Sequence, residues 1–233
     1  IEREVEEIDD TPELVIANED LAIDCINQQV TIDASGSTKD VDLVSGDTFT
    51  ATSGVAIKLG ADNDSLDLTG ADTSAAAPTD LDFVITGNGG ADAITLAAVA
   101  TGQDSLVYST QSDSTATDFD TITNFNADGV AADDLLDLSA FGFTGTADDA
   151  VVTKAAGVSI NASGDVEVTS AVAGNFFSDG GIDRGVAEAE VGGNLYVFAD
   201  VNKDGDYSAA DDLVIQLTGV AAADFDEANI TFA

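Results

Sequence analysis

The sequence predicts an all-β protein of short strands in a two-sheet or solenoid-like stack, with an immunoglobulin-like β-sandwich as the alternative. The first observation is composition. From residue 21 onward the chain consists mainly of Asp, Thr, Ser, Ala, Gly, Val and Ile, which suit pleated surfaces and tight turns. The second is that convincing helical periodicity is scarce, and the third is a short acidic unit that recurs before strand-like segments. With 44% hydrophobic residues, the chain can bury enough surface to fold.

The chain divides by composition into a short arm and one body. Residues 1–20 hold most of the glutamates and are predicted to be an acidic N-terminal arm, with room for a short helix after Thr11-Pro12. Residues 21–233 are expected to be a single β-rich domain. It begins with alternating apolar residues from Leu21 to Ile32, among which Cys25 is expected to be a small buried hydrophobe. Residues 195–233 are distinguished as the C-terminal region of this domain.

The charge excludes several partners. The chain has 45 acidic and 6 basic residues, no His, and a formal net charge of -39. Such a field repels phosphate backbones and anionic lipids, so we expect no nucleic acid partner. The sequence contains no stretch of 18 apolar residues, so we expect no segment that spans a membrane. Self-repulsion also opposes compaction, and the chain supplies few cations of its own. The neutralising charge is therefore expected from screening salt and bound divalent cations.

The recurring unit has the form Gly/Asp-x-Asp-x-aliphatic, followed by a strand. Its five copies, the last of them looser, are Asp62–Leu68, Gly90–Leu96, Gly102–Leu106, Asp118–Ile122 and Asp133–Leu138. The first Gly or Asp permits a tight turn, the second Asp points into that turn, and the aliphatic residue faces inward. Stacked turns can then share cations between successive carboxylates, because Asp-rich turns favour calcium. The candidate ligands in these turns are Asp62, Asp64, Asn88, Asp92, Asp120 and Asp134; the alternative is that these are ordinary Asp-containing β-turns.

At these residues the chain resembles the calcium-binding nonapeptide-repeat proteins exported by type I secretion systems, the RTX family, whose unit is G-G-x-G-x-D-x-U-x. The best copy is Gly87–Thr95, with Asn88 in place of the second glycine. The key aspartates are irregularly spaced, so the chain resembles more closely the degenerate regions beside such repeats, in surface-layer proteins and serralysin-type proteases. The resemblance implies export in an unfolded state and folding outside the cell, with the export signal inside residues 195–233.

A second motif follows the calcium register of an EF-hand loop. From Asp200 to Asp211 the chain places side-chain oxygens at loop positions 1, 3, 5, 9 and 12, a glycine at position 6 and a backbone carbonyl at position 7. The predicted metal ligands are Asp200, Asn202, Asp204, Asp206, Ser208 and Asp211. Strand-like segments flank the loop, so we expect a calcium hairpin without helices, similar in its last residue to dockerin loops. The alternative is an exposed acidic turn.

Catalysis is not expected. Without histidine the chain lacks the commonest general base and the imidazole ligand of zinc, so triad hydrolases and zinc hydrolases are excluded. Paired carboxylates can hydrolyse glycosides, but such clefts are usually lined by aromatic residues, and here there are no Trp and only 3 Tyr. No phosphate-binding glycine motif occurs either.

The sequence therefore predicts a secreted or cell-surface structural protein, such as a surface-layer, matrix or filament subunit, that folds and self-assembles with calcium. The alternatives are an adhesin or carbohydrate-binding module, with cell-surface polysaccharide as partner, and the C-terminal secretion module of a larger hydrolase. An apolar N-terminal strand at Leu14-Val15-Ile16 can act as the connector by adding to a neighbour's sheet edge. It can equally belong to the sheet of its own chain.

Overall fold

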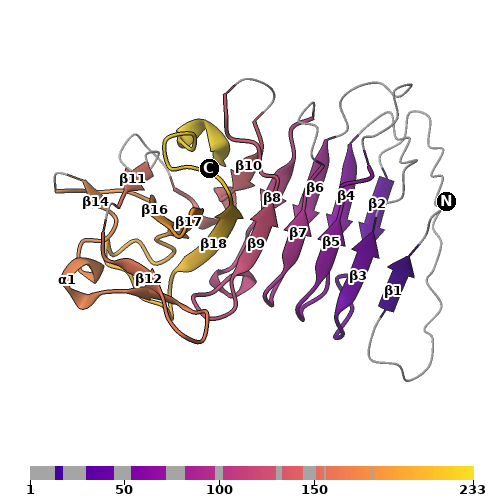
Figure 1. Ribbon diagram of the computed structural model, residues 1–233, viewed down its shortest axis with the longest axis horizontal. Coiled ribbons are helices and arrows are strands. Elements are labelled where there is room, and N and C mark those ends of the chain that lie inside the picture. The colour runs from indigo at the N-terminus through magenta and orange to yellow at the C-terminus, as the bar shows by residue number, and fades with distance from the viewer. Residues whose placement is uncertain are drawn as a thin grey trace.

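The computed structural model describes residues 14–17, 30–44, 54–71, 82–97, 102–129, 133–143, 151–154, 156–179 and 181–233. Within them the chain is all-β, and its strands stack side by side along the long axis of the molecule (Figure 1). The helical segments of this part are short: α1 (Ser170–Ala173) and three 3-10 turns, η1 (Gln111–Asp113), η2 (Ser139–Phe141) and η3 (Glu227–Asn229). The predicted Leu21 strand and Cys25 lie outside the described residues.

Two sheets make up the body. The larger sheet has nine strands in the order β1 (Leu14–Ala17), β3 (Val41–Val44), β5 (Ser65–Asp67), β7 (Ala93–Thr95), β9 (Asp120–Thr123), β18 (Leu213–Thr218), β17 (Asn194–Ala199), β16 (Val186–Val191) and β11 (Val151–Thr153). The smaller sheet has six, in the order β19 (Ile230–Thr231), β10 (Leu135–Asp137), β8 (Ser105–Val107), β6 (Phe83–Thr86), β4 (Val55–Lys58) and β2 (Val30–Asp33). Two short hairpins, β12 (Val158–Ile160) with β13 (Val166–Val168) and β14 (Ser178–Asp179) with β15 (Ile182–Asp183), complete the described strands.

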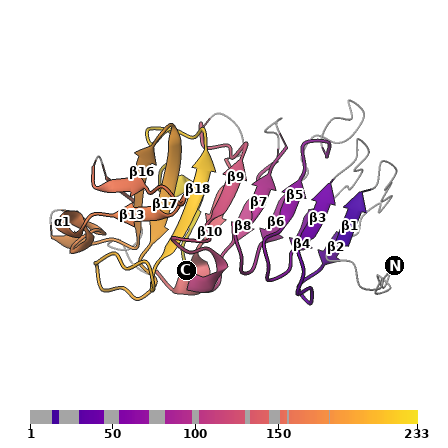
Figure 2. The ribbon, with the colours of Figure 1, turned by 60° about the horizontal axis from the view of Figure 1, so that its bottom comes forward.

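From β2 to β10 the chain alternates between the two sheets, so each coil of the solenoid contributes one strand to each. Every strand pairs in parallel with the strand two places along the chain, for example β5 with β7 and β4 with β6. Figure 2 shows the two rows of strands, with β3, β5, β7 and β9 in one row and β4, β6, β8 and β10 in the other. This parallel pairing confirms the solenoid-like two-sheet prediction and rules out the immunoglobulin-like alternative, whose sheets are antiparallel.

Alternation along each strand builds the core between the sheets. The aliphatic residue of each repeat unit faces inward as predicted: Leu66, Ile94, Leu106, Ile122 and Leu136 are each 1% exposed or less. Because the strands are parallel and in register, these side chains stack in continuous rows across successive coils. A second apolar cluster, centred on Phe176, Phe177 and Phe198, packs on the outer side of the larger sheet.

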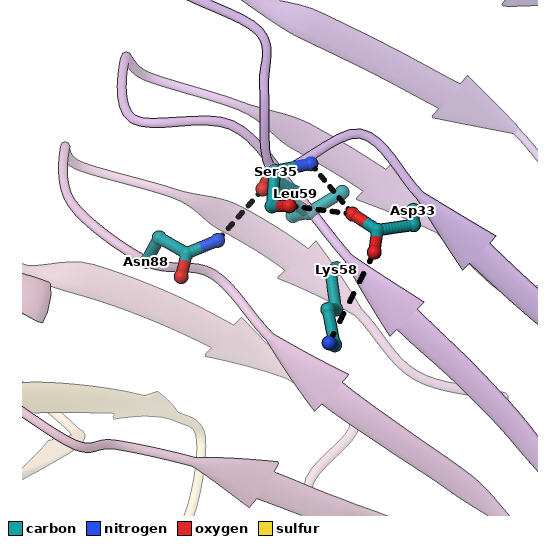
Figure 3. Close-up of polar contacts among 5 residues, drawn as sticks. All are labelled: Asp33, Ser35, Lys58, Leu59 and Asn88. Carbon is teal, nitrogen blue, oxygen red and sulfur yellow. Dashed lines mark hydrogen bonds and ion pairs between the residues drawn. The ribbon is translucent and has the colours of Figure 1, made fainter.

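Three strands of the roll end in the same Asp-x-Ser/Thr turn. The Asp67 carboxylate accepts hydrogen bonds from the backbone amide and the hydroxyl of Thr69, at 2.9 and 2.7 Å. Asp33 makes the same pair of bonds with Ser35, and also lies 4.0 Å from the Lys58 ammonium on the neighbouring strand (Figure 3). Asp137 accepts the Ser139 amide in the same way. Local side-chain bonds of this kind offer the backbone an alternative to the sheet ladder and so end the strand.

The expected helix after Thr11-Pro12 is wrong, because residues 14–17 form strand β1, which pairs in parallel with β3 of the same chain. The prediction rested on the local signal of an acidic segment after proline, whereas β-branched residues beside an open strand edge favour pairing. The strand at Leu14-Val15-Ile16 therefore belongs to the sheet of its own chain, rather than being donated to a neighbour.

Candidate cation-binding loop and aspartate ladders

The loop from Asp200 to Asp212 connects two long antiparallel strands. β17 ends at Ala199 and β18 begins at Leu213, and both are almost wholly buried, so the loop projects from a rigid hairpin. It therefore lacks flanking helices, as predicted. Two residues allow its sharp reversal by adopting positive φ: Lys203 at 60° and Gly205 at 80°. The Lys203 ammonium donates to the Gly142 carbonyl and lies 5.4 Å from the Phe143 ring centroid, which ties the loop to the body.

The first half of the loop wraps around the carboxylate of Asp200. Its two oxygens accept the backbone amides of Asp204 and Gly205, at 3.2 and 2.9 Å. The side-chain oxygen of Asn202 also accepts the Asp204 amide at 3.1 Å, and Asp204 in turn accepts the Asp206 amide at 2.9 Å. Three of the predicted ligands, at positions 1, 3 and 5, are thus brought together within one turn.

The second half of the loop is closed by Asp212. The Asp212 side chain is fully buried and accepts the backbone amides of Val201 and Ser208, at 3.2 and 2.8 Å, so it joins the two ends of the loop. The predicted ligand Asp211 is instead exposed and accepts the Ser208 hydroxyl at 3.0 Å. The EF-hand register predicts the closing ligand at position 12, whereas the structure buries the aspartate at position 13. The adjacent pair of aspartates in the sequence was a signal that either one could face inward.

The remaining predicted ligand of the loop, Asp206, turns away from its centre. One Asp206 oxygen accepts the Asn175 amide at 2.6 Å, and this bond fastens the loop to the segment after α1. In an EF-hand register the seventh residue contributes its carbonyl rather than its side chain, so this orientation is compatible with the predicted register.

Negative charge is concentrated inside the loop. Burial, reinforced by the charges of Asp200 and Asp204, raises the pKa of Asp212 to about 7. Burial likewise raises the pKa of Asp200, although three backbone hydrogen bonds oppose the rise. The loop carboxylates accept hydrogen bonds from backbone amides of the loop and do not converge on one point. Among the residues that the structure describes, no three Cys, Asp or Glu side chains are grouped as around a metal ion. A cation here would lower the cost of holding Asp200 and Asp212 ionised.

The aspartates of the repeat units form a ladder along the larger sheet. Asp64, Asp92 and Asp120 are each at most 2% exposed and follow one another at intervals of 28 residues. Each uses its Oδ1 atom to accept a backbone amide of the preceding coil: Asp120 from Asp92, Asp92 from Asp64, and Asp64 from Val41, at 2.7–2.9 Å. These side chains hold successive coils in register.

A second ladder runs along the smaller sheet. The Asp104 amide donates to Asp134 and the Phe83 amide donates to Asp104, both at 2.9 Å, across separations of 30 and 21 residues. The irregular spacing of the key aspartates in the sequence is therefore two interleaved series, one for each sheet. The Asp134 pKa is raised to about 6, chiefly by burial.

The larger ladder leaves two carboxylate oxygens without partners. The Oδ2 atoms of Asp92 and Asp120 and the Tyr108 hydroxyl are buried and make no hydrogen bond of ordinary geometry. Burial, reinforced by the charge that each carboxylate places on its neighbours, raises the pKa of both Asp92 and Asp120. Gly87 makes room for this pair, since a Cβ atom there would lie 2.3 Å from Asp92 Oδ2 and 3.5 Å from Asp120 Oδ2.

The other two predicted ligands lie away from the ladder carboxylates. Asp62 is exposed at the turn before Asp64. Asn88 has a φ of 65° and donates its side-chain amide to the Leu59 carbonyl of the preceding coil at 2.7 Å (Figure 3). Asn124, 36 residues further on, repeats the arrangement with a φ of 64° and a 3.0 Å bond to the Leu96 carbonyl. Asn88 thus acts as a turn residue whose side chain supplies a hydrogen bond to a backbone carbonyl of the neighbouring coil.

No protein-family model matches the chain, and no curated protein matches it. Among solved structures, it is similar to the R2 subunit of AlgE6, a mannuronan C5-epimerase of Azotobacter vinelandii, with 18% sequence identity over 82% of this chain and 92% of that one and a TM-score of 0.40. In the part of the chain that the structure describes, no helix is long and apolar enough to cross a membrane.

Proposed function

We propose that the chain is a calcium-binding structural module of a secreted or cell-surface assembly. The observation that carries the proposal is the Asp200–Asp212 loop, in which the carboxylates of Asp200 and Asp212 are both buried on a rigid hairpin and the charge of Asp200 disfavours ionisation of Asp212. A bound calcium ion would attract both carboxylates, so they could stay ionised without the repulsion that otherwise favours their protonated forms. Carboxylate oxygens in a turn of this register are the ligands that calcium prefers. Its own ligands would be Asp200, Asn202, Asp204 and Asp212.

The proposal extends to the charge of the whole chain. A net charge of -39 opposes the compact state, and a cation that binds only the folded chain adds its binding free energy to stability. A catalytic role finds no support in the same residues. The buried aspartates of the loop and of the ladders accept hydrogen bonds from backbone amides, and histidine is absent from the sequence.

Isothermal titration calorimetry of calcium into the Asp200→Asn/Asp204→Asn variant tests the loop. Asparagine keeps one acceptor oxygen for the backbone amides but removes the charge, so we expect the stoichiometry to fall by about one ion per chain. Asp224→Asn is the matched control, because it removes an exposed charge outside the loop and should leave the stoichiometry unchanged. An undiminished stoichiometry in the double variant would show that the loop is not the site.

We also propose that copies assemble head to tail through their sheet edges. Among the described strands, β1 and β2 form the edges at one end and β11 and β19 at the other. In each sheet the two edge strands run in the same direction, so a second copy placed end to end would continue both sheets with parallel pairing. Calcium would assist by screening the repulsion between copies.

Sedimentation of Thr31→Pro in calcium tests the edge. The Ala34 amide donates to Lys58 of β4, and since alternate amides of a strand point to opposite sides, the Thr31 amide points to the open side of β2. Proline removes this outward donor without breaking the bonds to β4, so assemblies should shrink to monomers. Thr31→Ala, which keeps the amide, should sediment as the unaltered chain. Large assemblies of the proline variant would refute this route.

A further inference from the structure

Glu188 is a buried carboxyl group in the middle of strand β16. It is 1% exposed and lies on the inner side of the sheet with Val186, since Ala187 and Ala189 belong to the outer apolar cluster. One of its oxygens, Oε1, accepts the Thr153 hydroxyl of strand β11 at 2.8 Å. The other, Oε2, is buried with no hydrogen-bond partner. No motif in the sequence singles out this glutamate.

The C-terminal segment, residues 219–233, packs into the same core. Its Val220, Phe225 and Ile230 side chains join the main apolar cluster, and its last strand, β19, forms the edge of the smaller sheet. In Figure 1 the C-terminal coil lies beside β10 at this end of the roll. Docking of this segment therefore closes the space between the sheets beyond the last regular coil.

The charged groups that face Glu188 are acidic. From the C-terminal segment these are Asp226 and Glu227, and both disfavour ionisation of Glu188. On its own strand Glu190 lies two residues away, near the Ala222 amide at 3.5 Å, and the cross-strand neighbour on β17 is the apolar Val197. Directly after β11, Lys154 donates its backbone amide to the Glu188 carbonyl, but its ammonium lies 5.5 Å from the Phe176 ring centroid, on the outer side.

An ionised carboxylate in this place is costly. Its unpartnered oxygen loses its water without gaining a donor, whereas the neutral carboxyl removes both the desolvation cost and the repulsion by the two acids. Burial, followed by the charges of Asp226 and Glu227, accordingly raises the pKa of Glu188 to about 7, and the Thr153 hydrogen bond opposes the rise.

We propose that Glu188 is a proton-controlled latch for the C-terminal segment, which stays docked while the carboxyl is neutral and is released when it ionises and draws in water. Release detaches β19 from β10, because β19 belongs to the segment. The neutral state is therefore the closed state of this end of the roll, and a rise of pH through neutrality opens it.

Hydrogen exchange measured by mass spectrometry tests the latch in the intact chain. From pH 5.5 to 8.5, the protection factors of residues 219–233 should fall at least tenfold, because a change in pKa from 4.5 to about 7 allows a fall of about 30-fold over this pH range. Protection of β4, which carries no aspartate of either ladder, serves as the internal reference. Glu188→Gln stays neutral at every pH and should abolish the fall, whereas Glu190→Gln, two residues along the same strand, should retain it.

A second variant keeps the test decisive if glutamine at 188 disturbs folding. Thr153→Val removes the hydrogen bond that favours the ionised form, so the midpoint of release should move to higher pH. Equal protection of the unaltered chain at both pH values, or a Glu188→Gln chain with the same fall, would overturn the proposal. So would a Thr153→Val midpoint that stays in place or moves to lower pH.

Discussion

In chelator, the protein should lose stability as the pH rises from 5 to 8. The pKa is raised to about 6 for Asp134 and to about 7 for Asp212 and Glu188, and it is also raised for Asp64, Asp92 and Asp120. Between the ordinary carboxyl pKa near 4 and these values, the folded chain holds protons that the unfolded chain has released. Stability therefore falls with rising pH across this window and levels off above it.

The expected loss is at least about 3 kcal/mol in the free energy of unfolding, since each unit of pKa change corresponds to about 1.4 kcal/mol and several groups contribute. Urea unfolding followed by circular dichroism at pH 5, 6.5 and 8 measures it. Asp92→Asn keeps the Oδ1 acceptor for the Asp64 amide and gives the unpartnered side a donor, so it should raise stability at pH 8 and flatten the curve. Asp62→Asn, an exposed change of equal charge, should do neither. A flat or rising curve for the unaltered chain would contradict the buried carboxylate account.

Replacing Gly90 by Ala should have the largest effect of any single methyl group in the roll. Gly90 has a φ of 116°, which a side chain rarely adopts, and an added Cβ would lie 2.4 Å from the Asp62 carbonyl oxygen and 2.6 Å from its carbon. The obstacle is backbone of the preceding coil, so the coils must separate. We expect a loss of about 3 kcal/mol or more in the free energy of unfolding, from backbone strain and lost coil contacts together.

The neighbouring glycine provides the matched control. A Cβ at Gly89 would lie 3.4 Å from the Ser112 carbonyl oxygen and 3.8 Å from the Ala61 carbonyl oxygen, both ordinary contacts, so Gly89→Ala should change stability by less than about 1 kcal/mol. Chemical unfolding of the two variants under one condition compares them directly. Equal effects at the two positions would mean that the coils are not stacked as closely as Gly90 requires.

The sequence predicted the parts of this fold that depend on short-range pattern. Leu66, Ile94 and Ile122 lie two residues after an Asp of the repeat unit, and strand alternation places them toward the core. The tight turn from Asp200 to Asp204 likewise follows from fixed local spacing. What could not be predicted depends on pairing between distant residues. Asp92 and Asp104 belong to different ladders, but coils of 21, 28 and 30 residues hide this in the spacing.

Burial explains the other differences. Asp211 and Asp212 are chemically identical, and only the pairing of β18 with β17 decides that Asp212 turns inward. Glu188 belongs to no sequence motif, and its burial depends on packing against segments that are distant in the sequence, among them Thr153 of β11. The apolar run Leu14-Val15-Ile16 indicated a strand, but its partner could not be predicted, because pairing with β3 of the same chain depends on a distant segment.

The ladder of the larger sheet also makes the length of the roll adjustable. Asp64, Asp92 and Asp120 occupy equivalent places at a constant interval of 28 residues. Each needs only a backbone N–H donor from the preceding coil, which any residue but proline supplies. A duplicate of residues 65–92 would therefore enter in phase, with its own aspartate, its own pair of strands and the same join on either side. The series ends where the Asp120 amide meets the Ser114 hydroxyl instead of another carboxylate, and Ser114 is bonded to Val214 of β18. Gene duplication thus has a natural module to copy here, and Ser114 marks the terminus beyond which the modules do not repeat.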